Sequence, residues 1–323
     1  GGSSPITVTG LSNGTTYTFT VTATNSYGTS TASATSNSVV PATVPDAPTI
    51  GTATGGNGQA TITFSAPVSN GGSAITYYTV SSNTGGFVAY GGSSPITLTG
   101  LTNGQAYTFT VTATNAAGTS TASVATNSVT PATVPDAPTI GTATAGNGQA
   151  TITFSAPSSN GGSAITYYAV TSNTGITAYG GTSPITVTGL TNGVAYTFTV
   201  TATNAVGTST ASVATNSATP ATVPDAPTNV AASIGDTTAG ITFSAPANNG
   251  SAITYYTVTS NTGGHSTTTY STSATMTGLT NGVTYTFTVT ATNAIGTSTA
   301  SGTSNGVTPA TVPGVPLNLA ATV

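Results

Sequence analysis

The sequence predicts an all-β chain of tandem Greek-key antiparallel β-sandwiches, arranged as beads on a string. Three observations support this class: a repeat with a period close to 90 residues, strict apolar/polar alternation in short segments, and Gly, Asn, Ser and Pro turn signals between those segments. No segment of the 323 residues shows the period of a helix. Each repeat is therefore expected to be a separate sandwich.

The repeat is visible in the motif ATVPDAPT, whose first proline is Pro45, Pro135 and Pro224; a relative of the motif has Pro313. The steps between these prolines are 90, 89 and 89 residues, and the motif TGL-[ST]-NG recurs at the same spacing. A unit of this length is too long for a solenoid repeat and has the size of one small sandwich.

The proline-containing linkers are the natural domain boundaries, since proline presets φ and removes a backbone donor. Gly1 aligns with Gly91, well inside a repeat, so we expect the chain to be a window on a longer polypeptide. The predicted domains are a partial one with C-terminal strands only (1–43), three complete ones (44–133, 134–222 and 223–311), and the first strand of a further one (312–323).

Seven strands are expected in the repeat 44–133. An edge segment at 47–53 follows the linker, 60–66 follows the turn GGNGQ, and 74–82 follows PVSNGGS. FVAYG, SPITLTG and AYTFTVTATN come next, and TSTASVATNSVTP closes the unit. Seven short strands with turns at this rhythm predict a Greek-key sandwich.

The block TFTVTATN, which occurs four times, has the clearest alternation. One side of such a strand is hidden in the core and the other is displayed. In the second occurrence the displayed side is threonine at 108, 110, 112 and 114, and the hidden side is Tyr107, Phe109, Val111 and Ala113.

Composition excludes several functional classes. Charged residues make up 1% of the chain: there is no lysine, arginine or glutamate, and no cysteine. Nothing can neutralise phosphate, so binding to nucleic acid or to anionic lipid is excluded. No apolar run approaches the ~18 residues of a membrane span, so we expect no membrane insertion. The hydrophobic fraction of 36% is still enough to build a core.

The motifs VPDAPT, ITFSAP, ITYYTV and GLTNGQAYTFTVTATNAAGTSTAS resemble a fibronectin type III array of the threonine- and glycine-rich, low-charge bacterial kind, along the whole chain. The resemblance implies a tyrosine corner, whose hydroxyl bonds back to the backbone, with leucine plugs in the core beneath it. The chain departs from the family in the second strand, where phenylalanine stands in place of the usual tryptophan and retains an aromatic core anchor. The implied structural residues are Tyr17, Tyr107, Tyr196 and Tyr285 (corner), Leu11, Leu101, Leu190 and Leu279 (plug), and Phe64, Phe154 and Phe243 (aromatic anchor).

Few residues could carry chemistry. Asp46, Asp136 and Asp225 recur in the linkers, but calcium prefers about 6–8 oxygen ligands, so these are weak metal candidates that we expect to cap turns. His265, surrounded by Gly, Ser and Thr, is expected to be an exposed loop residue. No base is placed to activate a hydroxyl, so we expect no enzyme and no cofactor.

Asn13 and Asn249 fit the N-glycosylation sequon, which arises readily by chance in a chain rich in Asn and Thr. O-linked sugar on the threonine faces is compatible with the composition.

Three readings of the threonine faces compete. In the first, threonine keeps a strand folded and soluble without charge. In the second, the uncharged surface allows copies of the chain to associate. In the third, the rows of threonine bind an ordered surface such as ice or crystalline polysaccharide, although the twist of a sheet disfavours this. We combine the first two into a structural or adhesive segment of an extracellular, cell-surface filament, fibre or sheath. The expected partners are the chain itself and extracellular polysaccharide. The alternative is a spacer array in a secreted polysaccharide-degrading enzyme.

Overall fold

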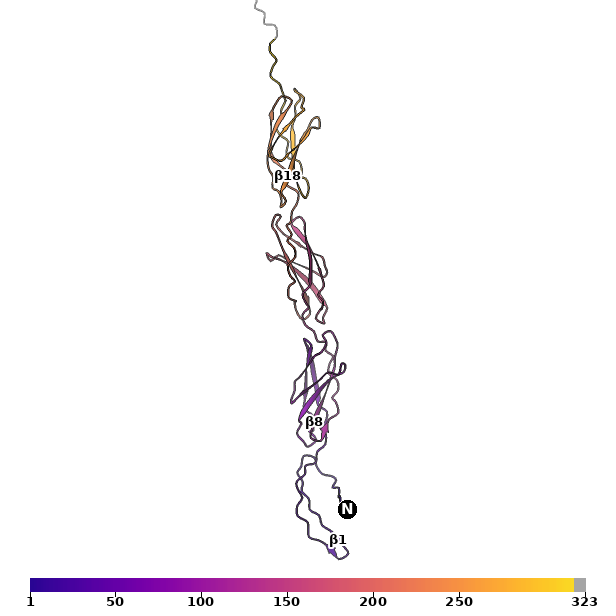
Figure 1. The fold of residues 1–323 in the computed structure, drawn as a ribbon. Coiled ribbons are helices and arrows are strands. Elements are labelled where there is room, and N and C mark those ends of the chain that lie inside the picture. Colours follow the sequence, from indigo (N-terminus) through magenta and orange to yellow (C-terminus); the bar gives the residue numbers. More distant parts are fainter. Residues whose placement is uncertain (317–323) are drawn as a thin grey trace, which may run out of the picture. The chain divides into compact units, whose positions relative to one another are not determined.

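The computed structural model describes residues 1–316, and every regular element within them is a β-strand (Figure 1). Contacts between Cα atoms divide the chain into two compact units. The first holds Gly1–Asp136 with Pro157–Thr166 and Thr203–Ser209; the second holds Ala137–Ala156, Tyr167–Ala202 and the described residues from Thr210 onward. The described residues contain no helix long and apolar enough to cross a bilayer. Of the strand predicted at 312–323, residues 317–323 lie outside the described part, and residues 312–316 form no strand.

The repeat predicted at 44–133 consists of two antiparallel sheets, one with the order β3-β4-β7 and the other with the order β6-β5-β8-β9. The chain changes sheet after β4, after β6 and after β7, which is how a Greek-key sandwich is threaded. The strand bounds are β3 Thr49–Gly56, β4 Gln59–Ser65, β5 Tyr77–Ser82, β6 Val88–Gly91, β7 Ile96–Thr99, β8 Phe109–Asn115 and β9 Gly118–Thr119.

The next two repeats use the same strand orders, except that an isolated bridge stands in the place of β9. Their sheets are β10-β11-β14 with β13-β12-β15, and β16-β17-β20 with β19-β18-β21. The bounds are β10 Thr139–Ala145, β11 Gln149–Ser155, β12 Ile165–Ser172, β13 Thr177–Gly180, β14 Ile185–Thr188, β15 Phe198–Asn204, β16 Thr228–Ile234, β17 Ala239–Ser244, β18 Ile253–Ser260, β19 Ser266–Thr269, β20 Ser273–Met276 and β21 Phe287–Asn293. The N-terminal segment has only β1 (Thr24–Asn25) and β2 (Gly28–Thr29).

Burial follows the predicted alternation. Along β8, Phe109, Val111 and Ala113 are at most 1% exposed, while the threonines between them are half-buried on the outer face. The core between the two sheets is aromatic and aliphatic: Phe64 packs on Tyr78 with ring centroids 4.8 Å apart. Each large buried side chain contributes about 1.5–3 kcal/mol to folding, so apolar burial is the main source of stability.

The final segment of each repeat is not the regular strand that the sequence predicted. In TSTASVATNSVTP only β9 and an isolated bridge at Val129 have strand pairing. Instead, every third residue turns inward against β8 and is at most 9% exposed: Ser120, Ser123 and Thr126. The seventh strand predicted for this segment is therefore reduced to β9, which is two residues long.

These three residues hold β8 through side chains as well as backbone. Each backbone N–H donates to a β8 carbonyl at 2.8–2.9 Å. Each side-chain Oγ accepts the N–H of that same β8 residue at 3.0–3.1 Å, and each hydroxyl donates to the carbonyl of the next residue in the chain at 2.7–2.8 Å. We call this arrangement the hydroxyl ladder. The hydrogen bond from a strand N–H to a side-chain hydroxyl recurs in the other repeats, at Ser30, Ser33 and Ser36, at Ser212 and Thr215, and at Ser298, Ser301 and Ser304.

The spacing of the ladder explains why strand pairing is lost. The bonded pairs are 7, 12 and 17 residues apart in sequence, so the final segment advances three residues for every two of β8. Two strand residues cover about 6.7 Å, which leaves about 2.2 Å per residue in the final segment, against about 3.3 Å in a strand. The segment is thus a repeated bulge, in which a hydroxyl takes the place of every missing backbone acceptor.

Ser123→Ala tests the ladder, because it leaves the buried N–H of Val111 without an acceptor. We expect a loss of about 1–3 kcal/mol, seen by calorimetry of the full chain as a shift of one domain's melting to lower temperature by several degrees, at roughly 4–8 °C per kcal/mol. Ser128→Ala, at an exposed position of the same segment, is the control and should change nothing. Equal melting of the two variants would contradict a structural role for the hydroxyl.

Candidate functional site

The implied corner tyrosines lie at equivalent places. Tyr107, Tyr196 and Tyr285 are 3–4% exposed. Their hydroxyls accept the backbone N–H five residues earlier in the chain, at 3.1–3.2 Å. Tyr17 accepts the N–H of Ser12 at 3.0 Å, and this hydrogen bond lowers the pKa of Tyr17. These hydrogen bonds tie the loop before each tyrosine to the tyrosine itself, so each hydroxyl oxygen already has a partner.

The implied plug and anchor residues lie in the core. Leu101, Leu190 and Leu279 are at most 6% exposed, whereas Leu11 in the partial repeat is half-buried. Each anchor ring meets a tyrosine of the neighbouring sheet, with centroids 4.8–4.9 Å apart, and burial raises the pKa of Tyr256. The pairs are Phe64–Tyr78, Phe154–Tyr168 and Phe243–Tyr256.

The linker aspartates make turn contacts. Asp136 accepts the hydroxyl of Ser158 at 2.7 Å, Asp225 accepts the side-chain amide of Asn249 at 3.0 Å, and the N–H of Asp46 donates to a loop carbonyl at 3.0 Å. Among the described residues, no three His, Cys, Asp or Glu side chains come close enough together to hold a metal ion.

His265 is not the exposed loop residue that was predicted. Its ring is half-buried and packs edge-on against Tyr285, with centroids 6.0 Å apart, as Phe87 packs against Tyr107. The backbone N–H of His265 donates to Ser260 Oγ at 3.0 Å. The equivalence with Phe87 was hidden because the surrounding residues differ, FVAY in one repeat and HSTT in the other. His265 thus covers a tyrosine corner.

The two sequons differ in their surroundings. Asn13 is exposed in a loop. The side-chain nitrogen of Asn249 donates to the carbonyl of Val223 and to Asp225, both at 3.0 Å. A glycan on that nitrogen would remove a donor from the linker contacts, since glycosylation uses the same atom.

Sequence analysis missed a buried asparagine at the end of TFTVTATN. Asn115 is 4% exposed, and its amide nitrogen donates to the carbonyls of Thr43 and Asn70, both at 2.8 Å. Its side-chain oxygen accepts the N–H groups of Ala117 and Gly118 at 2.9 and 3.1 Å. Asn204 and Asn293 make the same set of contacts. The signal in the sequence was a polar residue at a position where the alternation predicts a buried side chain. Asn115 holds the linker against the end of the strand.

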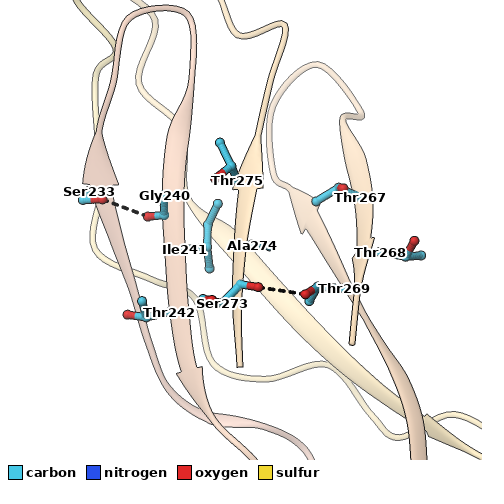
Figure 2. A pocket seen from close by; sticks show the side chains of 10 residues that line it. All are labelled: Ser233, Gly240, Ile241, Thr242, Thr267, Thr268, Thr269, Ser273, Ala274 and Thr275. Atoms are coloured by element: carbon cyan, nitrogen blue, oxygen red, sulfur yellow. Dashed lines mark hydrogen bonds between the residues drawn. The ribbon is translucent and has the colours of Figure 1, made fainter. Parts of the chain in front are cut away.

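The last complete repeat has a hollow of about 460 Å³. Its lining residues come from β16, β17 and β20 on one side and from β19 on the other (Figure 2). Its lining is mainly hydroxyl-bearing and has no ionisable side chain. Gly240 opens it, because the equivalent residues Thr61 and Thr151 carry hydroxyls that bond across the sheet at 3.0 and 3.1 Å. Gly240 has no side chain to bond the hydroxyl of Thr275, its partner on β20.

Paired tyrosines form the other exposed feature. Tyr77 and Tyr90 lie on the outer face of β5 and β6, with ring centroids 6.0 Å apart, and are 40% and 70% exposed. Tyr167 and Tyr179 repeat the pair on β12 and β13, at 5.8 Å and with 40% and 69% exposure. Nothing in the alternation distinguished these outward rings from the inward tyrosines beside them.

Gly240→Thr should close the hollow and stabilise its domain by about 1 kcal/mol, since glycine inside a strand is unfavourable and the added hydroxyl can bond Thr275. A Cβ at Gly240 meets only the rotatable hydroxyl of Ser233, at 2.8 Å. The control is Gly51→Thr, where a Cβ would lie 2.9 Å from the backbone oxygen of Thr63, so the melting temperature should fall. Calorimetry measures both, and destabilisation by Gly240→Thr would contradict this reading of the hollow.

Comparison with known proteins agrees with this architecture. The family model of the fibronectin type III domain matches residues 46–129, 136–218 and 225–307. The chain is similar to the crystal structure of chicken CNTN1 FN1-FN3 domains, with 17% sequence identity, a TM-score of 0.32, and coverage of 82% of this chain and 99% of that one. No curated protein sequence matches the chain significantly. With three family matches over more than half of its residues, the chain belongs to the fibronectin type III family.

Proposed function

We propose that this chain is a structural segment of an extracellular, bacterial cell-surface protein, in which tandem domains serve as the shaft of a filament, fibre or sheath and associate with copies of themselves. Fibronectin type III domains are commonly extracellular and typically non-catalytic, and a tandem array of them suits a repeat or spacer role. We argue for the role in a self-associating filament from the surface chemistry of the described strands.

One observation carries the proposal: none of the described strands contains a charged side chain. The four aspartates lie in the linkers or, for Asp236, in the turn between β16 and β17. Surface charge of one sign normally keeps copies of a protein apart. The strand faces of this chain lack that repulsion.

Two of the sheet edges lack the usual protection as well. β3 and β7 are the outer strands of one sheet and β6 is an outer strand of the other. Natural proteins commonly protect such edges with lysine, proline or a bulge. β6 and β7 contain neither lysine nor proline, whereas β3 has a bulge between Ile50 and Ala53, and the backbone of Ala53 is hydrogen-bonded to the side chain of Asn127. The hydroxyl ladder occupies the far edge of β8, which leaves β6 and β7 as the open edges that favour pairing between copies.

Adding charge at an edge should prevent association. Thr99 and Thr188 are exposed, equivalent residues on the edge strands β7 and β14. We expect the unmodified chain to form concentration-dependent oligomers or fibres in sedimentation velocity and electron microscopy, largely unaffected by salt. The double variant Thr99→Lys/Thr188→Lys should remain monomeric at the same concentrations.

The matched control, Thr99→Ser/Thr188→Ser, keeps a neutral hydroxyl at both positions and should associate as the unmodified chain does. Calorimetry should show that both double variants remain folded. If the unmodified chain stays monomeric at high concentration over weeks, self-association is wrong and the spacer role in a secreted polysaccharide-degrading enzyme becomes the better account.

A further inference from the structure

We propose that the tyrosine pairs Tyr77–Tyr90 and Tyr167–Tyr179 are binding platforms for neutral polysaccharide. This activity is separate from the self-association proposed above, because it uses the outer face of a sheet and not its edge. Each pair lies wholly within one repeat, so a platform needs no contribution from another domain.

The placement of the rings follows from strand register. Tyr78 points into the core and is 6% exposed, so Tyr77 next to it points outward. Tyr90 on β6 is paired with Thr79 on β5, two residues beyond Tyr77, and this diagonal brings the two rings into edge-to-face contact at 71°. The Tyr167–Tyr179 pair has an angle of 73°. The two pairs therefore have the same geometry.

Folding does not explain why both rings are exposed. Single exposed apolar groups are normal on protein surfaces, but adjoining ones mark interaction sites more often. Tyrosine is well suited to binding, since it offers a large rigid face and a polar tip with little rotamer freedom to lose. With 70% and 69% exposure, Tyr90 and Tyr179 have the more accessible rings.

The surroundings of the first pair indicate the class of ligand. Across the outer face, Tyr77 is paired with Thr114 and Thr79 with Thr112, and the hydroxyl of Thr114 lies 2.9 Å from that of Thr119. The strands β5, β6, β8 and β9 contain no ionisable side chain other than tyrosine. A ligand for this face is therefore uncharged, with an apolar face for the rings and hydroxyls for the threonines.

A pyranose ring in a neutral polysaccharide has both properties: C–H groups on its faces and hydroxyls around its rim. A second copy of the chain fits less well. Packing two threonine faces together would bury rows of hydroxyls without fixed partners, which is unfavourable, whereas a sugar supplies donors and acceptors along its whole rim. The face consequently favours a saccharide over its own copy.

The last complete repeat provides a natural contrast. There, Thr268 is paired with Thr257 in the register at which Tyr90 is paired with Thr79. Tyr255 is retained as the equivalent of Tyr77, but its partner ring is replaced by a hydroxyl. This repeat has the same sheet order, so the fold accepts threonine at the position of Tyr90.

The test uses the full chain and Tyr90→Thr/Tyr179→Thr, the substitution that the last repeat already carries. Retention is measured on insoluble cellulose, chitin and β-1,3-glucan, and by affinity electrophoresis in soluble neutral glucan. We expect the unmodified chain to be retained by at least one of these neutral polysaccharides, and the double variant to be retained at least tenfold more weakly. Tyr270→Thr is the control, because Tyr270 is an 86% exposed tyrosine outside the pairs; it should bind as the unmodified chain does.

Calorimetry and sedimentation velocity are run on the same samples, so that unfolding and self-association are measured independently of binding. The proposal is overturned if no neutral polysaccharide retains the chain, if the double variant binds as well as the unmodified chain, or if only an acidic polysaccharide such as alginate retains it. If the double variant loses self-association and keeps its retention, the pairs bind a second copy and the saccharide assignment is wrong.

Discussion

The structure depends on one constraint: with no lysine, arginine or glutamate and only four aspartates, the polar groups inside the domains must be satisfied by hydroxyls, amides and the backbone. The hydroxyl ladder shows how this is done. Ser120, Ser123 and Thr126 each accept a β8 N–H through the side chain and donate to the backbone in turn. Among the described residues, no buried side-chain nitrogen or oxygen lacks a partner. The buried polar side chains of the described residues are thus satisfied without ion pairs.

This constraint also determines what the surface can do. Asn115 and its equivalents clamp the linkers with amide groups, so no ion pair is needed there. The strand faces are left with threonine, and on two repeats with a pair of tyrosine rings. The strand faces carry no charge to repel copies of the chain or to attract ions, and this is the basis on which we propose self-association and the binding of neutral saccharide.

Most of the fold could be predicted from the sequence, because alternation in segments such as TFTVTATN reports directly which side is buried. The corner tyrosines and core phenylalanines came from the resemblance to a family. The final segment could not be recognised by alternation, since its period of three depends on hydroxyls replacing backbone acceptors. His265 and Gly240 were missed because their roles appear only when equivalent positions of different repeats are compared in space. Asn115 was overlooked because polar residues were assigned to the displayed side.

Hydrogen exchange of the β8 amides tests most directly whether side-chain hydroxyls hold the last segment of each domain. The amides of Phe109, Val111 and Ala113 are bonded to hydroxyl oxygens, whereas those of Thr110 and Thr112 face the pairing strand β5. If the hydroxyls act as full acceptors, both sets should exchange at the slow rate set by opening of the whole domain. Fast exchange of Phe109, Val111 and Ala113 beside slow exchange of Thr110 and Thr112 would contradict the account.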